Sequence, residues 1–219
     1  DKSDKVLPRI NQLTGGLVAA YTALTLTCAI VYTALGMTFF DAVNHAMTTL
    51  STGGYSTHDA SMGFYGDKLP LLWISSLFMF IGGLPFSILV LLAVRGRIDA
   101  ARDPQIRVFA GYVCFFGFAV ALYLRLTTDV PFTEALTHSF FNIISLITTT
   151  GYASQDYSLW GAFAVACAFL ATFLGGCSGS TAGGIKAYRF IVLFELMANG
   201  LRRLVYPSSV QTVRYGDRV

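Results

Sequence analysis

The chain has 219 residues, of which 54% are hydrophobic and only 12% are charged. Soluble domains carry about 25% charged residues, so this composition excludes an ordinary soluble protein and indicates a membrane protein. The four cysteines, Cys28, Cys114, Cys167 and Cys177, lie in apolar or Gly-rich stretches and show neither metal-ligand spacing nor a disulfide framework. We therefore expect small, buried side chains at these positions.

The net charge of +3 is less informative than the distribution of the charges along the chain. Lys68 and Arg125 fall on one side of the predicted membrane segments, and the other basic residues fall on the opposite side: Lys2, Lys5, Arg9, Arg95, Arg97, Arg102, Arg107, Lys186, Arg189, Arg202, Arg203, Arg214 and Arg218. This asymmetry predicts a cytoplasmic N-terminus, 95–107 loop and C-terminus. The outer side carries acidic residues: Asp41, Asp59, Asp67, Asp129, Glu134 and Asp156. Acidic groups at an outer mouth raise the local cation concentration, although each one also fits an ordinary solvated loop.

The first half of the chain predicts a spanning helix followed by a shorter one. Residues 1–13 are a polar lead-in, and residues 14–37 are apolar for long enough to cross a bilayer. Residues 40–50 are too few to cross it, at about 1.5 Å per residue. They lead directly into Ser51-Thr52-Gly53-Gly54-Tyr55. We predict a re-entrant helix whose C-terminal end, the negative end of its dipole, points at this run.

A second spanning helix is predicted from Pro70 to about Val94. The sequence Gly82-Gly83-Leu84-Pro85 in its middle predicts a kink. The polar, basic stretch 95–105 then forms a loop.

The same order of elements recurs in the second half. Residues 106–127 predict a spanning helix and residues 133–147 a second short re-entrant helix. That helix leads into Thr148-Thr149-Thr150-Gly151-Tyr152, an outer loop at 153–157, and a spanning segment from Ser158. The fold class predicted is an all-α membrane protein with two tandem helix–re-entrant loop–helix units.

The distance in sequence between corresponding motifs of the two units is not constant. The runs at 51–55 and 148–152 are 97 residues apart, whereas Phe80-Ile81-Gly82-Gly83 and Phe173-Leu174-Gly175-Gly176 are 93 apart. The second short helix should therefore be about one turn longer, with a shorter outer loop after it. His45 and His138 lie on these helices, and we interpret both as packing residues rather than ligands.

A hydroxyl-rich run that ends in Gly and an aromatic residue has the chemistry of a cation filter. Irregular backbone at membrane depth is tolerated only where protein or a water-filled cavity surrounds it. Backbone carbonyls there can replace the water around a cation, and Gly supplies the unusual dihedrals that turn them inward. We predict that carbonyls of these residues bind the ion: Ser51, Thr52, Gly53, Gly54, Thr148, Thr149, Thr150 and Gly151.

The stretch 175–186 breaks the pattern, because five Gly occur within ten residues. Each Gly costs roughly 1 kcal/mol relative to Ala in a helix, so the helix must break near the bilayer middle and resume from about 185 to 201. We interpret the break as a flexible gate at the inner mouth of the pore. Its residues are Gly176, Cys177, Ser178, Gly179, Ser180, Thr181, Ala182, Gly183 and Gly184.

Three alternatives to a gate stay open. A phosphate-binding loop would need Lys directly after Gly184, but Ile185 intervenes and the context is helical. An intramembrane hydrolase could use Ser178 or Ser180 as the nucleophile, but it would need a base nearby. The glycines could also serve close packing alone.

Two cations follow the break, at Lys186 and Arg189. We expect them to reach the cytoplasmic interface or to pair with Glu195, rather than to act electrostatically beneath the pore.

Three motifs together resemble the TrkH/KtrB/HKT superfamily of potassium transporters, and TrkH most closely. They are the run Ser-Thr-Gly-Gly-Tyr-Ser-Thr-His-Asp at 51–59, Thr-Thr-Thr-Gly-Tyr at 148–152, and Gly-Gly-Cys-Ser-Gly-Ser-Thr-Ala-Gly-Gly-Ile-Lys at 175–186. Members of this family carry four helix–pore–helix repeats. The resemblance implies that residues 1–105 are the second repeat and residues 106–219 the third.

The resemblance also implies a function. Gly54 and Gly151 match the filter glycine, and 176–184 match the intramembrane gate of the third repeat. It implies potassium uptake across the bacterial inner membrane without enzymatic chemistry, K⁺ as the transported ion, and no organic cofactor. The implied partners are membrane lipid, a second pore subunit in a homodimer, and a TrkA-like cytosolic nucleotide-binding ring.

The first and fourth filters of the family are absent from the sequence. We expect a fragment of a longer transporter, because the first residue is Asp1 rather than Met, or else a pair of such chains. Two other functions stay open, a sodium-permeable member of the same family and an intramembrane serine hydrolase. The sequence also leaves open whether the transporter is a channel or a coupled symporter.

Overall fold

The structure, a computed structural model, describes residues 6–95 and 103–205. Within these ranges every helix is an α-helix or a 3-10 helix. The β-structure there is limited to an isolated bridge between Leu174 and Ile185. The predicted all-α class is therefore confirmed. Several predicted cytoplasmic charges lie outside the described residues: Lys2, Lys5, Arg97, Arg102, Arg214 and Arg218.

The first half of the chain begins with one long helix, which shorter helices follow. Its elements are α1 (Val6–Ala34), α2 (Phe39–Leu50), the 3-10 turn η1 (Ser61–Tyr65), α3 (Leu69–Gly82) and α4 (Phe86–Arg95). Helix α2 begins where the Thr38 hydroxyl accepts a hydrogen bond from the Asp41 amide, an ordinary N-terminal cap. Helix α1 packs against both α2 and α4, and α2 packs against α3.

The second half repeats this order of elements. It contains α5 (Pro104–Thr127), α6 (Phe132–Ile147), the turn η3 (Tyr157–Trp160), α7 (Ala162–Phe173) and α8 (Ala187–Val205). Pro104 opens α5 and the Asp103 side chain caps it by accepting from the Gln105 amide. Helix α6 has 16 residues and α2 has 12, so the motif spacing predicted the extra turn correctly. The connection after α6 is also shorter than the one after α2.

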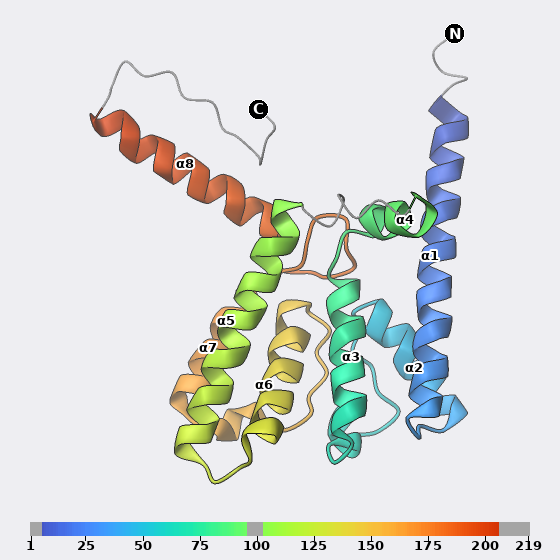
Figure 1. Ribbon diagram of the computed structural model, residues 1–219, viewed down its shortest axis with the longest axis vertical. Coiled ribbons are helices and arrows are strands. Elements are labelled where there is room, and N and C mark those ends of the chain that lie inside the picture. The colour runs from blue at the N-terminus through green and yellow to red at the C-terminus, as the bar shows by residue number, and fades with distance from the viewer. Residues whose placement is uncertain (1–5, 96–102, 206–219) are drawn as a thin grey trace.

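Helix α6 occupies the interior of the bundle. It contacts α3, α5 and α7, and most of its side chains from Ala135 to Ile147 are buried. Figure 1 shows that α6 ends partway along the bundle and that the chain then returns beside it toward the end from which it came. The chain does the same after α2.

The predicted kink in the first half is wrong, because the helix breaks completely. Helix α3 ends at Gly82 and α4 starts at Phe86. In Figure 1, α4 lies across the end of the bundle instead of continuing α3. There, Phe86 packs against Tyr21 of α1, with ring centroids 5.8 Å apart. Pro85 cannot donate a backbone hydrogen bond, which favours a break after the two glycines.

Three smaller expectations also need correction. The segment expected from Ser158 starts at Ala162, because residues 157–160 form the turn η3. The helix expected from 185 begins at Ala187 and continues to Val205. The four cysteines are free as expected, but Cys114 is exposed rather than buried.

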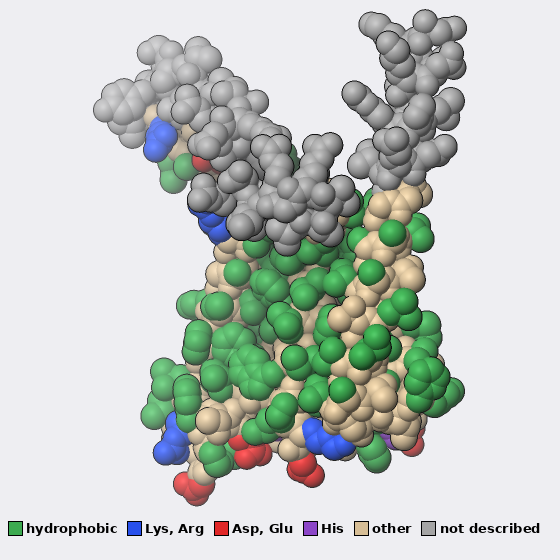
Figure 2. Space-filling model, turned by 45° about the vertical axis from the view of Figure 1, so that its right-hand side comes forward, with side chains coloured by type: hydrophobic (Ala, Val, Ile, Leu, Met, Phe, Trp, Pro, Cys, Tyr) green, Lys and Arg blue, Asp and Glu red, His purple; other side chains and the backbone are tan. Residues whose placement is uncertain are grey.

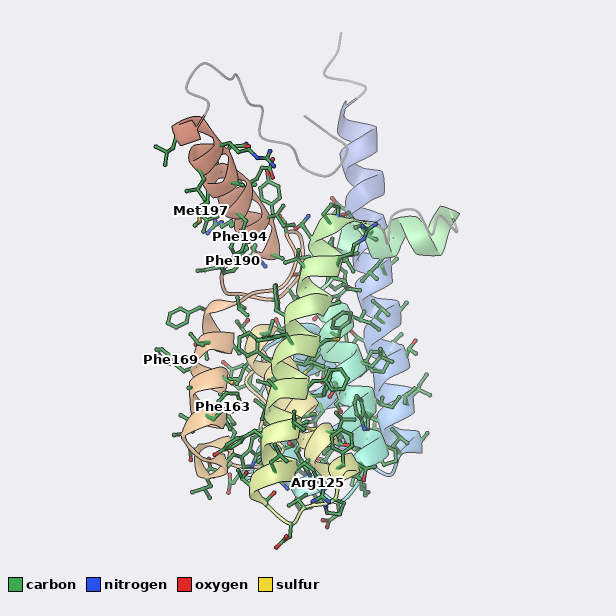
Figure 3. The ribbon with its side chains drawn as sticks, turned by 60° about the vertical axis from the view of Figure 1, so that its left-hand side comes forward. Arg125, Phe163, Phe169, Phe190, Phe194 and Met197 are labelled. Carbon is green, nitrogen blue, oxygen red and sulfur yellow. The ribbon has the colours of Figure 1, made fainter. Side chains whose placement is uncertain are left out.

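The apolar flank of the bundle has the character of a lipid-facing surface. The segments Thr14–Ala34 and Pro104–Thr127 are long and apolar enough to cross a membrane, and only 11% and 28% of their most apolar windows are buried. A core helix of a soluble protein would be mostly buried. Figure 2 shows hydrophobic side chains covering the flank, with basic groups at the upper end and both acidic and basic groups at the lower end. In Figure 3, Arg125 lies at that end, while Phe163, Phe169 and Phe194 project outward along α7 and α8.

Candidate functional site: two backbone runs and the loop beneath them

The two predicted filter runs have the same backbone conformation. Thr52 and Thr149 both lie in the left-handed region, with φ of 52° and 57°. Two residues later, Gly54 and Gly151 do so again, with φ of 67° and 87°. Positive φ is uncommon in threonine and is found where the surrounding structure enforces it, often at functional sites.

The same hydrogen bonds fold each run back from its helix. The Gly53 amide donates to the Thr48 carbonyl at 2.8 Å, and the Thr150 amide donates to the Ser145 carbonyl at 2.9 Å. Both pairs are related by the 97-residue offset of the sequence motifs. These bonds use the amide groups of the runs and leave the carbonyl oxygens to other partners.

A hydroxyl on each short helix holds the far end of its run. The Thr48 hydroxyl donates to the Tyr55 carbonyl at 2.8 Å, and the Ser145 hydroxyl donates to the Tyr152 carbonyl at 2.7 Å. Sequence reasoning did not assign this role to Thr48 and Ser145. The signal was present, because both are hydroxyl residues placed seven positions before the aromatic residue.

The runs are brought into direct contact. A Cβ built on Gly54 would lie 1.8 Å from the Thr150 carbonyl oxygen and 3.3 Å from the Gly151 carbonyl carbon. By contrast, a Cβ on Gly151 would meet nothing within 4 Å. The predicted ion-binding residues of the two halves therefore lie side by side, and the second run borders open space.

Tyr152 connects the second run to the first half of the chain. Its side chain is buried, and its hydroxyl lies 2.5 Å from the Thr48 hydroxyl and donates to the His45 carbonyl at 3.2 Å. The equivalent Tyr55 is 78% exposed. Of these two tyrosine side chains, therefore, only that of Tyr152 is buried against the other half.

The two helix histidines are satisfied packing residues, as predicted. His45 is buried between the Asp41 carbonyl at 2.8 Å and the Ser56 hydroxyl at 2.9 Å. His138 lies 2.9 Å from the Ser154 hydroxyl. In both halves the histidine ties the short helix to the segment that follows the run. Among the described residues, no group of three or more His, Cys, Asp or Glu could hold a metal.

Asp41 is not an ordinary solvated loop acid. Its carboxylate is buried and accepts hydrogen bonds from the hydroxyls of Thr57 at 2.6 Å, Thr38 at 2.7 Å and Tyr65 at 3.1 Å. The hydroxyl donors, Thr57 first, lower the pKa of Asp41 to about 2. This cluster fixes the loop between the first run and α3 to the start of α2.

Two other predicted outer acids do face solvent. Asp59 and Asp156 are exposed and line a cavity of about 520 Å³ between the two outer loops, which also includes Ser61 and Ser154. The Ser158 hydroxyl, and then its amide, hydrogen-bond to Asp156 and lower the pKa of that carboxyl.

The predicted gate loop docks into the break between α3 and α4. The Cys177 amide donates to the Gly83 carbonyl at 2.9 Å, and the Thr181 amide donates to the Gly82 carbonyl at 3.2 Å. In return, the Phe86 amide donates to the Gly179 carbonyl at 3.0 Å. The backbone of residues 82–86 in the first half therefore supplies the groups that receive the loop of the second half.

The loop also contacts both runs through their left-handed threonines. The Thr52 hydroxyl donates to the Thr181 carbonyl at 3.0 Å, and the Gly183 amide donates to the Thr149 hydroxyl at 2.7 Å. The Thr181 hydroxyl contacts the Leu50 carbonyl at 3.0 Å, where α2 ends. Residues 181–183 thus lie directly against the ends of both runs.

Close packing accounts for some of the loop glycines. A Cβ on Gly175 would lie 2.3 Å from the Gly183 carbonyl oxygen, and one on Gly183 would lie 2.9 Å from the Thr149 hydroxyl. Gly179 has φ of +78° and open space around it, so there the backbone dihedral sets the need for glycine.

The expected pairing of Lys186 with Glu195 is wrong. Its amino group turns back onto the loop, donating to the Ala182 carbonyl and lying 3.4 Å from the Ser180 hydroxyl, instead of pairing with Glu195. Ser180 itself donates to the Cys177 carbonyl at 2.7 Å. The serine proton is therefore engaged with a carbonyl, which does not favour a nucleophile.

The fold and the paired backbone runs define a helical membrane protein built from two similar halves. The family model described as TrkH, cation transport protein, matches residues 1–218. The chain belongs to the TrkH family.

Individual relatives agree with this assignment. The chain is 42% identical to the Trk system potassium uptake protein TrkI of Halomonas elongata, over 100% of the chain and 44% of that protein. It is 34% identical to TrkH of Escherichia coli K12, over 99% of the chain and 45% of that protein. The crystal structure of the potassium transporter TrkH from Vibrio parahaemolyticus matches with a TM-score of 0.88 and 31% identity, over 97% of the chain and 46% of that structure. The chain spans less than half the length of the curated relatives it matches.

Proposed function

We propose that the chain forms half of a potassium uptake pore in which its two backbone runs supply two of four filter segments. The observation that carries this proposal is the contact between the runs, in which Gly54 lies against the Thr150 carbonyl. Two runs with matching left-handed residues, held by matching hydrogen bonds, can present successive carbonyl oxygens toward one axis. The names of the relatives support potassium as the ion.

The pore units would be residues 1–105 and 106–219, with α2 and α6 as re-entrant helices. The return of the chain beside each short helix supports this topology. The end that carries Arg125 would face outward, and the end with α4 and α8 would face the cytoplasm. Two further units of the same kind would complete the filter.

Residues 176–184 would act as the gate below the filter. Their contacts with Thr52 and Thr149 support this role, because a loop bonded to both runs would obstruct an ion path below them. Lys186 holds the loop by binding the Ala182 carbonyl. Opening would require these bonds, and those to Gly82 and Gly83, to be exchanged for water.

We also propose the partners implied by the family resemblance. These are surrounding lipid, a second pore subunit, and a cytosolic nucleotide-binding ring that acts on the gate. Exposed apolar side chains of α8, including Phe194 and Met197, offer surface for lipid or for a second subunit at the proposed cytoplasmic end.

Ion flux into liposomes that contain the full-length protein tests the proposal. Deletion of residues 178–182 should raise the potassium leak, because the loop no longer covers the filter. A protein that assembles fully but carries no flux after the deletion would show that the loop is structural. Equal permeation of sodium and potassium by the unaltered protein would favour the sodium-permeable alternative.

A further inference from the structure

An apolar groove lies on the outer flank of the bundle, at the seam between the two halves. It is lined by side chains from α3, α5 and α6, and its volume is about 240 Å³. Its floor is buried and includes Val113, Phe140 and Ile144. Its rim is exposed and includes Trp73, Leu77 and Cys114.

The groove offers its occupant no unsatisfied polar group. The Ser76 hydroxyl, which lies in the lining, donates within its own helix to the Leu72 carbonyl at 2.8 Å. The Trp73 indole nitrogen donates to the Thr137 hydroxyl at 2.8 Å. A polar ligand or an ion would lose its hydration without compensation here, so the occupant must be a hydrocarbon.

The position of the groove selects the source of that hydrocarbon. Its α5 residues, 110–114, lie within the segment Pro104–Thr127 that can cross a membrane. The exposed Leu77 side chain is part of its rim, and the exposed Phe118 ring packs on Phe140 of its floor, with ring centroids 5.0 Å apart. The groove extends along α3 from Trp73 to Phe80, about 10 Å at 1.5 Å per residue, which suits an extended chain of methylene groups.

We propose that this groove binds the acyl chain of a membrane phospholipid. The chain would pack against Phe140 and Ile144, on the side of α6 that faces the seam. The Ile144 carbonyl accepts the hydrogen bond of the Thr148 amide at 2.8 Å, at the start of the second run. A bound acyl chain therefore supports the helix end that positions this run.

Photo-crosslinking tests the proposal on the full-length protein in liposomes that contain a phospholipid with a diazirine in its acyl chain. After irradiation, mass spectrometry of peptides locates the adducts. Adducts at Leu77 and Cys114 should persist when excess unlabelled phospholipid is added, because a bound chain exchanges slowly. Adducts at Leu126, which is 77% exposed, should fall in proportion to the dilution.

A matched pair of variants on α5 separates the groove from general lipid contact. Ala110→Phe fills the groove and should lower the yield there by roughly tenfold, the effect of overfilling a packed site. Gly111→Phe adds the same bulk where a Cβ meets nothing within 4 Å, and should leave the yield unchanged. The proposal would be overturned if unlabelled phospholipid lowered the adduct yield at the groove as much as at Leu126. It would also be overturned if Ala110→Phe left the groove yield unchanged. The absence of groove adducts when Leu126 is labelled would overturn it as well, because another protein segment would then cover the groove.

Discussion

Gly54 of the first half lies so close to the Thr150 carbonyl of the second half that a Cβ on Gly54 would be 1.8 Å from that oxygen. The contact joins two residues 96 positions apart in the sequence. It is a backbone-to-backbone approach, so no side-chain rotation could relieve an added methyl group. This approach fixes the separation of the two runs.

Gly54→Ala should therefore prevent the two halves from assembling. The methyl group would meet backbone, and φ of +67° adds strain for any L residue, so we expect a loss of more than about 3 kcal/mol in stability. Gly53→Ala is the matched control. Its Cβ would meet the flexible Ser51 side chain at 3.2 Å and the exposed Tyr55 ring at 3.5 Å, and we expect a loss of about 1 kcal/mol or less. Thermal unfolding of the purified variants measures both, and equal midpoints would contradict the contact.

Gly151→Ser should have a different outcome. A Cβ at Gly151 meets nothing within 4 Å, so the protein should fold, but φ of +87° must relax at a cost of roughly 1–2 kcal/mol. The carbonyls of the run would turn from their native directions. We expect the ratio of potassium to sodium permeability to fall, as measured by reversal potentials or by competing fluxes. An unchanged ratio in a folded variant would count against the filter.

Local patterns predicted the helices because each depends on nearby residues. The extents of α2 and α6 follow from their apolar segments, and the difference of one turn between them follows from the motif spacing. The packing role of His45 and His138 also followed from their place on apolar short helices. The motif that separates this family from other membrane proteins, 175–186, could be recognised because it is long and rich in glycine.

Contacts between the halves could not be predicted in this way. The bond between Thr52 and Thr181 spans 129 residues, and the pair Thr48–Tyr152 spans 104. No periodicity links such positions. The error at Lys186 has a local cause, because its partner Ala182 lies only four residues earlier, in a loop whose irregular backbone follows no periodicity. Contacts between the halves do explain the complete break at Gly82–Pro85, since the loop that occupies the break comes from the other half.

Thr181→Val should loosen the loop while preserving its shape. The Thr181 hydroxyl contacts the Leu50 and Gly82 carbonyls, both at 3.0 Å, and valine has the same outline without the donor. Removal of such a bond costs about 1 kcal/mol and leaves the carbonyls to find water. We expect a higher potassium leak in liposome flux. Ser178→Ala, whose side chain is exposed, should leave the leak at the level of the unaltered protein. If Thr181→Val leaves the potassium leak unchanged, the bonds of the Thr181 hydroxyl do not hold a gate closed.

Tyr152→Phe should weaken the connection between the two runs. It removes the hydroxyl that lies 2.5 Å from Thr48 and 3.2 Å from the His45 carbonyl in a buried site, at a cost of about 1–3 kcal/mol. A double-mutant cycle with Thr48→Val isolates the pair, and we expect a coupling of at least about 0.5 kcal/mol in thermal stability. Additive effects would show that each residue acts independently. Tyr157→Phe, on the outer turn η3, serves as the control and should be neutral.

The Asp41 cluster should make the outer loop sensitive to strong acid but not to mild acid. Its pKa is lowered from 3.8 to about 2, chiefly by the Thr57 and Thr38 hydroxyls. A lowered pKa means that the carboxylate contributes stability in full above about pH 4, and that this contribution is lost as the pH falls toward 2. Melting temperature measured from pH 7 to pH 3 should show the corresponding decline only at the acid end.

Asp41→Asn should lower the melting temperature at pH 7 and flatten that acid decline. An amide offers one acceptor oxygen to three hydroxyl donors, so we expect a loss of about 1–3 kcal/mol. Asp59→Asn changes the same charge at an exposed position and should leave both the melting temperature and its acid decline unaltered. If both variants retain the full acid decline, the decline arises from other carboxyl groups and the cluster is not what holds the outer loop. If only Asp41→Asn abolishes it, one buried carboxylate joins the start of α2 to the segment that follows the first run.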